Sequence, residues 1–248
     1  GGNIVPTATD SITLGINNNP GSGTLSGTLV VAAVSGEATF NDIAIDKIGS
    51  GYTLDATASG LTTATSASFD ITVGSATQLV YGVEPTNTVS TVSITPAIEV
   101  QVQDAGGNLV TSATDSITLA INNNPSSGTL SGTLSVSAVS GIATFSDISI
   151  DKTGTGYTLN ATASGLSTAT SASFDITPGP KSQLAFSVEP INTSATLSIS
   201  PAIKVQVQDA QGNLVPTATD TVTLAINNNP GSGTLSGTLA VAAVGGEA

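Results

Sequence analysis

The sequence predicts an all-β protein built from tandem two-sheet sandwich domains, and three observations support this prediction. Thr, Ser, Val, Ile, Asn and Gly are abundant while only 8% of the residues are charged, a composition typical of pleated strands and tight turns. Apolar and polar residues alternate over short segments, as they do in strands with one buried face. The whole pattern recurs with a period of 105 residues, from Asn17 to Asn122 and on to Asn227.

The repeat is clearest in the sequence Asn-Asn-Asn-Pro, which begins at each of those three asparagines. A period of this length exceeds that of solenoid repeats, which bury their faces only against neighbours, and it matches a sandwich domain with a core of its own. We therefore expect three domains, of which only the middle one is complete. They are a partial repeat over residues 1–74 that lacks its first strands, a complete repeat over residues 75–178, and a partial repeat over residues 179–248 that lacks its last strands.

The two partial repeats admit two interpretations. Either the chain is cut from a longer array of repeats, or neighbouring subunits complete each other by exchanging strands. Residues 1–38 and 211–248 duplicate the same block of the repeat, so in an exchanged pair they would compete for one place. This duplication favours the longer array, and both interpretations stay open at this point.

Alternation within the complete repeat predicts which side chains face the core. The expected strands and their inward residues are Gln78–Glu84 (Leu79, Tyr81, Val83), Ala97–Asp104 (Ile98, Val100, Val102), Ser116–Ile121 (Ile117, Leu119, Ile121), Tyr157–Ser164 (Tyr157, Leu159, Ala161) and Ser171–Thr177 (Ala172, Phe174, Ile176). Short strands are expected at 129–130 and 134–139. Between Phe145 and Ile148 the inward phase changes, which predicts a bulge or kink at Ser146–Asp147.

Charge and composition argue against several classes of function. Four Lys and no Arg stand against 17 acidic residues, for a net charge of -13, so no surface is expected that neutralises nucleic-acid phosphates or an anionic membrane. No apolar run is long enough to span a bilayer, so membrane insertion is not expected. The chain has no Cys and no His, so disulfides, thiolate sites and the commonest general base and transition-metal ligand are absent.

One segment of the repeat carries a family resemblance. The sequence Gly-Thr-Gly-Tyr-Thr-Leu at 154–159, with Gly-Ser-Gly-Tyr-Thr-Leu at 49–54, looks like the tyrosine corner of immunoglobulin-like folds, where a Tyr opens the penultimate strand. Together with Val-Gln-Val-Gln-Asp-Ala at 100–105 and Ala-Ser-Phe-Asp-Ile-Thr at 172–177, it resembles the bacterial immunoglobulin-like repeats of invasin- and intimin-type adhesins. The resemblance implies tandem immunoglobulin-like β-sandwich repeats of 105 residues, in which Tyr52 and Tyr157 have a structural role and hydrogen-bond back to the preceding loop.

Repeats of that family serve most often as stalks or fibres, sometimes as receptor-binding tips, and sometimes as accessory modules of secreted hydrolases. The near-identity of the copies favours the stalk, because a repeated spacer needs only repeatable geometry. We therefore expect a structural, non-enzymatic segment of a secreted or cell-surface fibre or adhesin that associates with itself as a filament or bundle. The alternatives are an adhesive module for a host or surface ligand and an accessory domain of a secreted hydrolase.

Acidic residues supply the candidate ligand sites. Calcium prefers oxygen donors, and such donors recur near the expected junctions between repeats, which makes weak calcium binding the one cofactor hypothesis. The candidate residues are Asp70, Glu84 and Asp104 at the first junction and Asp175, Glu189 and Asp209 at the second. Two pairs of acids have the residue type needed for glycoside chemistry, Asp42 with Asp46 and Asp147 with Asp151, but their recurrence on a strand's polar edge favours ordinary solvated charge. No catalytic residue is therefore assigned.

Two further features concern covalent chemistry and stiffness. Lys204 lies on an early strand, as the lysine of an internal isopeptide bond would, but its counterpart in the middle copy is Glu99, so such a bond would not recur. Asn160 and Asn192 begin glycosylation sequons that other copies lack. Only about seven residues separate Ile71 from Leu79, and the next linker is equally short, so limited bending and a semi-rigid fibre are expected.

Overall fold

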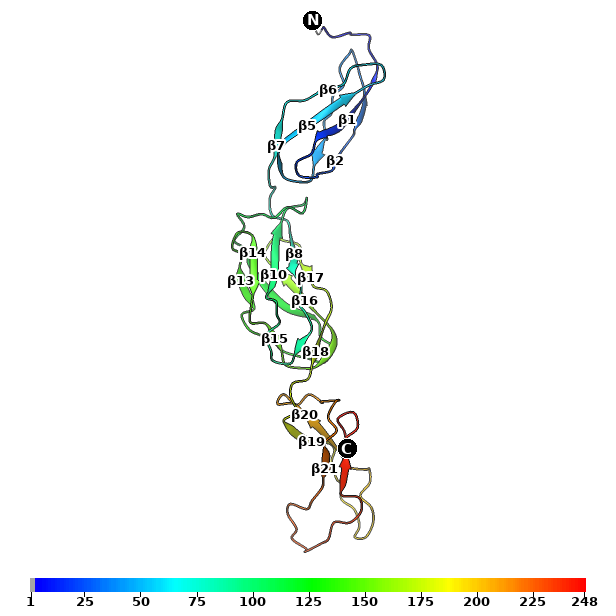
Figure 1. The fold of residues 1–248 in the computed structure, drawn as a ribbon, viewed down its shortest axis with the longest axis vertical. Helices are drawn as coiled ribbons and strands as arrows, with labels where there is room; N and C mark the ends of the chain where they lie inside the picture. Colours follow the sequence, from blue (N-terminus) through cyan, green and yellow to red (C-terminus); the bar gives the residue numbers. More distant parts are fainter. Residues whose placement is uncertain (1–2) are drawn as a thin grey trace.

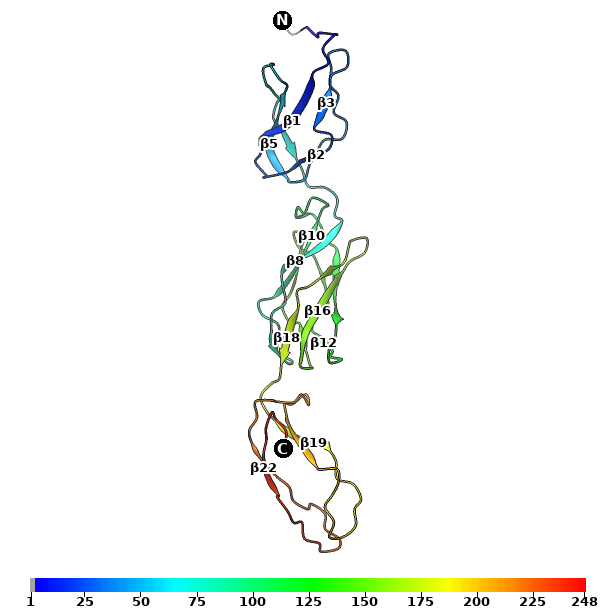
Figure 2. The same ribbon diagram turned by 90° about the vertical axis from the view of Figure 1, so that its right-hand side faces the viewer.

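The computed structural model describes residues 3–248 as three bodies arranged in a line, joined by short linkers (Figure 1). The view turned by 90° shows the same linear order (Figure 2). The first body holds strands β1 to β7, the middle one β8 to β18, and the last β19 to β22. Within residues 3–248 there is no helix, and so none that could cross a membrane. The all-β fold of tandem sandwich repeats is therefore what the chain adopts.

The middle repeat is a two-sheet sandwich. One sheet has the order β14-β10-β8, formed by Ile142–Phe145, Ile98–Gln103 and Gln78–Val83. The other has the order β13-β11-β16-β18-β9, formed by Ser135–Ser137, Ser116–Asn123, Gly154–Thr162, Phe174–Thr177 and Thr88–Val89, with β17 (Ala169–Thr170) also on β16. A small ribbon pairs β12 (Leu130–Ser131) with β15 (Ser149–Ile150).

The core of the middle repeat lies between these sheets and follows the predicted alternation. Ile98, Val100 and Val102 of β10 are fully buried, as are Tyr157 and Leu159 of β16. The strand is interrupted after Phe145 and resumes at Ser149, which places the break at the predicted kink. The kink shifts the alternation by one residue, so apolar side chains on both sides of it face inward. Phe145 before the kink and Ile148 and Ile150 after it all lie in the core.

One predicted inward residue is wrong. Ala172 is exposed, and β18 begins only at Phe174. The reason lies at Ser171, whose side chain is buried and whose hydroxyl accepts a hydrogen bond from the Leu159 amide at 2.9 Å while it donates to the Ala172 carbonyl. This local bonding turns the chain out of register before the strand starts, so the alternation does not extend back to Ala172.

The first repeat contains one sheet of the sandwich. Its order is β3-β1-β5-β6, formed by Val30–Ala32, Ser11–Asn18, Gly49–Thr57 and Ala64–Thr65, with β7 (Phe69–Ile71) on β5 and a ribbon of β2 (Leu25–Ser26) with β4 (Ala44–Ile45). Residues 38–40, the counterparts of residues 143–145 in β14, form no strand. Their pairing partner in the middle repeat is β10, whose counterpart would precede residue 1.

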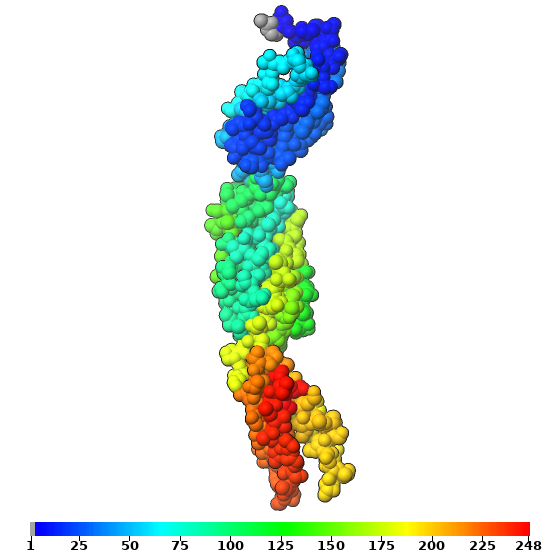
Figure 3. Space-filling model, turned by 45° about the vertical axis from the view of Figure 1, so that its right-hand side comes forward, coloured from blue at the N-terminus to red at the C-terminus, as the bar shows by residue number. Residues whose placement is uncertain are grey.

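The last repeat contains the counterparts of β8, β10, β11 and β13 of the middle repeat. It consists of two strand pairs, β19 (Gln183–Val188) with β20 (Lys204–Gln208), and β21 (Thr221–Thr223) with β22 (Ala240–Ala242). A small cluster centred on Val205, Val207 and Val222 packs between them. Beyond this cluster the last repeat divides, and the space-filling view shows two separate extensions at its far end (Figure 3).

Candidate functional site at the junctions between repeats

At each junction a loop of one repeat contacts a turn of the next. In the first junction the loop is 46–48, which connects β4 to β5, and the turn is 104–108, which follows β10. The two segments are nearly sixty residues apart in sequence, and hydrogen bonds join them directly. For a chain of repeats this contact is the candidate site, because it joins two successive repeats directly.

Asp104 organises the turn of the second repeat. The residue is 5% exposed, and one carboxylate oxygen accepts hydrogen bonds from the backbone amides of Gly106 at 3.0 Å and Asn108 at 2.9 Å. The other oxygen accepts one from the Gly74 amide at 2.9 Å. Gly74 belongs to the linker, so a single buried carboxylate fixes both the turn and the chain that enters the repeat.

Asn108 bridges the two repeats. Its side-chain nitrogen donates to the carbonyl oxygen of Asp46 at 2.8 Å, and its side-chain oxygen accepts from the amide of Ile48 at 3.2 Å. The same nitrogen also contacts the Asp104 carboxylate at 3.0 Å. Asn108 is buried, so these bonds are shielded from competing water and hold the loop in one register.

Lys47 adds a third bond across the junction. Its ammonium group donates to the carbonyl oxygen of Gly106 at 2.6 Å. A charged donor makes this a stronger bond than one between neutral groups. The loop 46–48 therefore contacts the turn through its backbone on both sides of Lys47 and through the lysine side chain itself.

The second junction repeats the same arrangement with the residues 105 positions further on. Asn213 donates to the Asp151 carbonyl at 2.9 Å and accepts from the Thr153 amide at 3.2 Å, while Lys152 donates to the Gln211 carbonyl at 2.6 Å. The buried Asp209 accepts from Gly179, Gln211 and Asn213. One bond is new, because the Ser90 hydroxyl of the middle repeat donates to Asp209 at 2.9 Å.

The tyrosine corner anchors the loop that makes the junction. The Tyr52 hydroxyl donates to the Lys47 carbonyl at 2.9 Å, and the Tyr157 hydroxyl donates to the Lys152 carbonyl at 2.9 Å. Both tyrosines are fully buried and pack beside Phe69 and Phe174, with ring centroids 6.2 and 6.1 Å apart. The bond back to the preceding loop is the geometry that the resemblance implied, and here that loop also holds the next repeat.

The buried aspartates remain charged at neutral pH. Burial acts to raise the pKa of the Asp209 carboxyl, but the hydrogen bonds from Asn213, Gly179 and Ser90 outweigh it and lower that pKa to about 2. The same balance lowers the pKa of Asp104, where the donors are Asn108, Gly74 and Gly106. The carboxylate form is therefore the one that accepts the bonds of the turn.

The acids predicted to hold calcium do not gather at one point. Only Asp104 and Asp209 lie in the junction contacts described above. Asp70 accepts bonds from the Ser50 hydroxyl and the Gly51 amide, Asp175 accepts from the Gly156 amide, and Glu84 accepts from the Ala172 amide, while Glu189 lies on the exposed surface. Within residues 3–248 no three acidic side chains are grouped closely enough to hold a metal ion.

The other acids and Lys204 also have local partners. Asp42 accepts from the amide and hydroxyl of Thr28, and Asp147 accepts from those of Thr133. These bonds lower the pKa of both carboxyls, because the donors favour the ionised form. Lys204 forms an ion pair with Glu247 at 2.6 Å on the surface.

Sequence reasoning missed Asn108, Asn213, Lys47 and Lys152 as junction residues. The segment 104–108 was recognisable only as a turn, since Asp, Gly and Asn are common turn residues for reasons unrelated to a neighbouring domain. A signal was nevertheless present. The chain has only four lysines, and two of them recur at the repeat spacing, which is unexpected for residues that serve solubility alone.

No family model matches this sequence, and a search of curated proteins finds no match. Among solved structures, the chain is similar to invasin, a bacterial integrin-binding protein, at a TM-score of 0.35 and 13% identity, covering 91% of this chain and 46% of that one. Domains 4–9 of the surface layer protein SbsC match at a TM-score of 0.31 and 17% identity, covering 92% of this chain and 32% of that one. A beta-glycosidase from Bacteroides vulgatus matches at a TM-score of 0.34 and 15% identity, covering 67% of this chain and 21% of that one.

The chain thus spans less than half the length of each of these structures. The TM-scores are all below 0.5. The fold is therefore assigned from the strand order and register of the middle repeat and not from these similarities. The predicted resemblance to invasin-type repeats stands as a distant structural likeness without a matching sequence family.

Proposed function

We propose that this chain is a non-enzymatic spacer of a secreted or cell-surface fibre, in which hydrogen-bonded junctions hold successive repeats in a fixed orientation. The observation that supports this proposal is the recurrence of the same cross-junction bonds at both junctions, from Asn108 and Lys47 in one and from Asn213 and Lys152 in the other. Domains joined only by linkers move relative to one another by default. A contact that repeats with the domain gives every junction the same geometry.

The structure of the repeat is consistent with this role. Each repeat adds one sandwich to the length of the chain, so the reach of the fibre scales with the number of copies (Figure 1). The acids that resemble a catalytic pair, Asp42 and Asp147 among them, are bonded to loop amides rather than directed into a shared cleft. The low density of charge also favours lateral contact between fibres, because little repulsion per unit area opposes it.

The proposal is tested by removing the bridging amides. Replacing Asn108 and Asn213 by Ala deletes the bonds to the loops 46–48 and 151–153, so we expect a broader range of interdomain angles and a shorter mean end-to-end distance. Small-angle X-ray scattering of the monomeric chain measures this directly as a change in the pair-distance distribution. The core of each repeat should be unaffected.

A matched control is Asn124→Ala. This side chain also makes two bonds to backbone, donating to the Gly128 carbonyl and accepting from the Gly128 amide, but both lie within one loop of one repeat. The Asn124→Ala chain should scatter like the parent. If the double variant of the junction also scatters like the parent, the bonds do not set the orientation and the spacer proposal is wrong in its mechanism.

A further inference from the structure

We infer that one open strand edge in each repeat joins this chain to a second copy of itself, by antiparallel pairing with the same edge of the other chain. The strands at this edge are β3 in the first repeat, β13 in the middle one and β22 in the last. The inference rests on the proposed fibre function and adds to it the contact between neighbouring fibres. The middle repeat shows the edge in a complete sandwich, and the other two repeats show it again.

β13 is the outermost strand of its sheet, and only its inner side is paired, with β11. The Leu134 carbonyl accepts a hydrogen bond of 2.8 Å from β11, and the Ala138 amide donates one of 2.9 Å to the residue before that strand. Alternate residues of an antiparallel edge strand bond to the neighbouring strand. The backbone N–H and C=O groups of Ser135 and Ser137 therefore point away from β11, and both residues are exposed.

The same edge is open in all three repeats. The two inward bonds recur at the repeat spacing, with lengths of 2.8 to 2.9 Å in every copy. The residues left facing outward are exposed in each case, and they are Val30 with Ala32, Ser135 with Ser137, and Ala240 with Ala242. An edge that is open in the same register in every copy is suited to a contact that a fibre makes at any of its repeats.

The other sheet edges of the complete repeat, residues 75–178, are covered, short or interrupted. The loop 163–167 covers β8, since the Leu79 amide donates to the Ser167 carbonyl at 3.1 Å. β9 has only two residues, and β14 ends at the kink at 146–147. Covers, short strands and bulges are the devices by which proteins keep their edges from pairing. The edge of β13 differs, because its bonded segment runs without interruption from 134 to 138.

The open edge also has none of the side chains that keep edges apart. The segments 28–34, 133–139 and 238–244 contain no charged residue and no proline, although charges and prolines are the usual protection of an exposed edge. The net charge of the chain is -13, so these neutral segments are places where a second copy meets little repulsion. The valine that ends each segment is highly exposed, at 75% for Val34, 76% for Val139 and 82% for Val244.

A second copy of the edge is the occupant that fits it best. When two such edges meet about a two-fold axis, Ser135 of one chain lies opposite Ser137 of the other, and each of these pairs exchanges both of its N–H···O bonds. In the same register, Val139 lies beside Thr133 of the second copy, which covers part of the exposed valine. Identical edges thus satisfy every outward backbone group of Ser135 and Ser137 by symmetry alone.

The open edges do not all face the same side of the chain. In Figure 2, β3 lies on the right of the first repeat and β22 lies on the left of the last. Two chains lying side by side would therefore pair at one of these repeats and not at both. Each chain should meet different neighbours along its length, which gives a network of fibres instead of isolated pairs.

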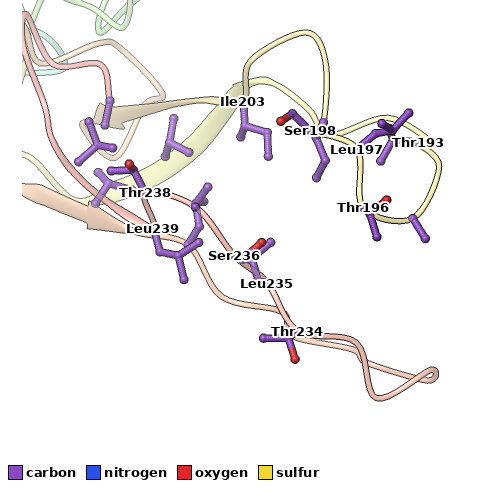
Figure 4. Close-up of a pocket in the computed structure, with 18 of the residues that line it drawn as sticks. Thr193, Thr196, Leu197, Ser198, Ile203, Thr234, Leu235, Ser236, Thr238 and Leu239 are labelled. Atoms are coloured by element: carbon purple, nitrogen blue, oxygen red, sulfur yellow. The ribbon is translucent and has the colours of Figure 1, made fainter.

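A groove of about 690 Å³ in the last repeat is a weaker candidate for a binding surface. Ile203 and Leu239 are among the residues that line it (Figure 4). Their counterparts in the complete repeat are Ile98, which lies in the core, and Leu134, which packs against it. The groove is therefore assigned no ligand, whereas the edge of β13 is a surface that the complete repeat itself exposes.

The test is sedimentation velocity of the 248-residue chain over a concentration series up to its solubility limit. The parent chain should form oligomers that grow beyond a dimer. The first variant combines Ala32→Pro, Ser137→Pro and Ala242→Pro. Proline removes an outward N–H that has no partner within the chain, and edge strands accept proline on that side, so each repeat should remain folded. We expect the association constant of each contact to fall at least about thirtyfold, because the contact loses one hydrogen bond from each chain.

Two lysine variants make the test independent of proline's effect on folding. Lysines at the edge should weaken association, even though they bring the net charge of the chain closer to zero. The control carries the same number of lysines at exposed positions of the same face, directly opposite on the neighbouring strand, and should associate like the parent. The edge variant combines Val30→Lys, Ser135→Lys and Ala240→Lys, and the control combines Thr13→Lys, Thr118→Lys and Thr223→Lys.

Disulfide formation tests the register of the pairing. The chain has no cysteine of its own, so a Ser135→Cys chain can be mixed with a Ser137→Cys chain under mild oxidation. In the two-fold register the mixed pair lies directly opposite, at a Cα separation that a disulfide can bridge. Mixed dimers should therefore form faster than the dimers of either variant alone.

The inference is overturned if the parent chain remains monomeric at every concentration, if the edge variants associate as well as the parent, or if the mixed disulfide has no advantage. Loss of association in the lysine control would overturn it too, because added charge and not the edge would then be decisive. These results are separable from those on the spacer. A chain that is stiff by scattering but never associates keeps the spacer proposal and removes this inference, and a chain that associates through its edges but bends freely at its junctions does the reverse.

Discussion

The same strand has a different environment in the middle and last repeats. β8 has the sequence Gln-Leu-Val-Tyr-Gly-Val and β19 has Gln-Leu-Ala-Phe-Ser-Val, and each pairs with the next long strand in antiparallel fashion. Leu79 is nevertheless buried while Leu184 is exposed. The difference comes from the segment 163–167, whose backbone bonds to Thr77 and Leu79 in the middle repeat. Burial here depends on residues nearly ninety positions later in the chain.

Secondary structure shows the same dependence. Thr88–Val89 form a strand because β18 pairs with them in parallel, whereas Thr193 and Ser194 at the matching positions of the last repeat form none. In the first repeat the counterparts of β14 are likewise not a strand. Short edge strands of this fold therefore exist only where the partner strand is present, and the local sequence alone does not determine them.

The largest expected effect is a difference in stability between substitutions at the two leucines. Leu79→Ala should destabilise the middle repeat by about 2–5 kcal/mol, because it leaves a cavity in a closed core. Leu184→Ala should change the stability of the last repeat by no more than about 0.5 kcal/mol, since the side chain is exposed. Residue-resolved hydrogen exchange in the full chain measures both. Equal losses of protection would show that the last repeat closes on itself in solution.

A smaller effect is expected at the tyrosine corners, where the first and middle repeats are alike. Tyr157→Phe and Tyr52→Phe each remove one hydrogen bond to a loop carbonyl and should each cost about 1 kcal/mol. Because the bond geometry is the same at both sites, the two values should agree. Thermal unfolding with exchange protection of the loops 46–48 and 151–153 measures the loss. A much larger value at Tyr157 would mean that the complete core, rather than the hydroxyl, determines the cost.

The smallest expected effect on stability at neutral pH concerns the two junction aspartates, Asp104 and Asp209. Their contribution to stability changes only in acid. Their folded pKa values lie below the unfolded value near 4, so the stability they contribute is present above that value and is lost as the pH falls through the folded pKa. For Asp209, whose folded pKa is about 2, this loss takes place as the pH falls from about 4 to about 2. Ser90→Ala removes one donor and should raise the Asp209 pKa toward its usual range without affecting Asp104. Carboxyl-carbon NMR titration measures this pKa. An unchanged Asp209 pKa would show that the Ser90 hydroxyl does not stabilise the carboxylate.

Much of the fold could be predicted from the sequence, and the reasons are local. Strict alternation in segments such as Ile98–Val102 specifies a buried face, and the repeat spacing identifies the domain. Ala172 could not be placed correctly because the buried Ser171 bonds to the neighbouring strand. The alternation of apolar and polar residues does not reveal such a bond. The junction was predicted as a short linker with weak calcium sites. The contact between Asn108 and Asp46 was missed, since these residues are far apart in sequence and turn propensity does not encode their meeting.

The tyrosine corner has a consequence for a fibre under tension. Tyr52 ties the loop 46–48 to the centre of one sandwich, and Asn108 ties the same loop to the next. In the proposed fibre, a pulling force along the chain would therefore be shared between the covalent connection at 72–77 and this parallel route through side chains. The load would then reach the interior of each domain as well as its outermost strand, so neighbouring domains would resist extension together.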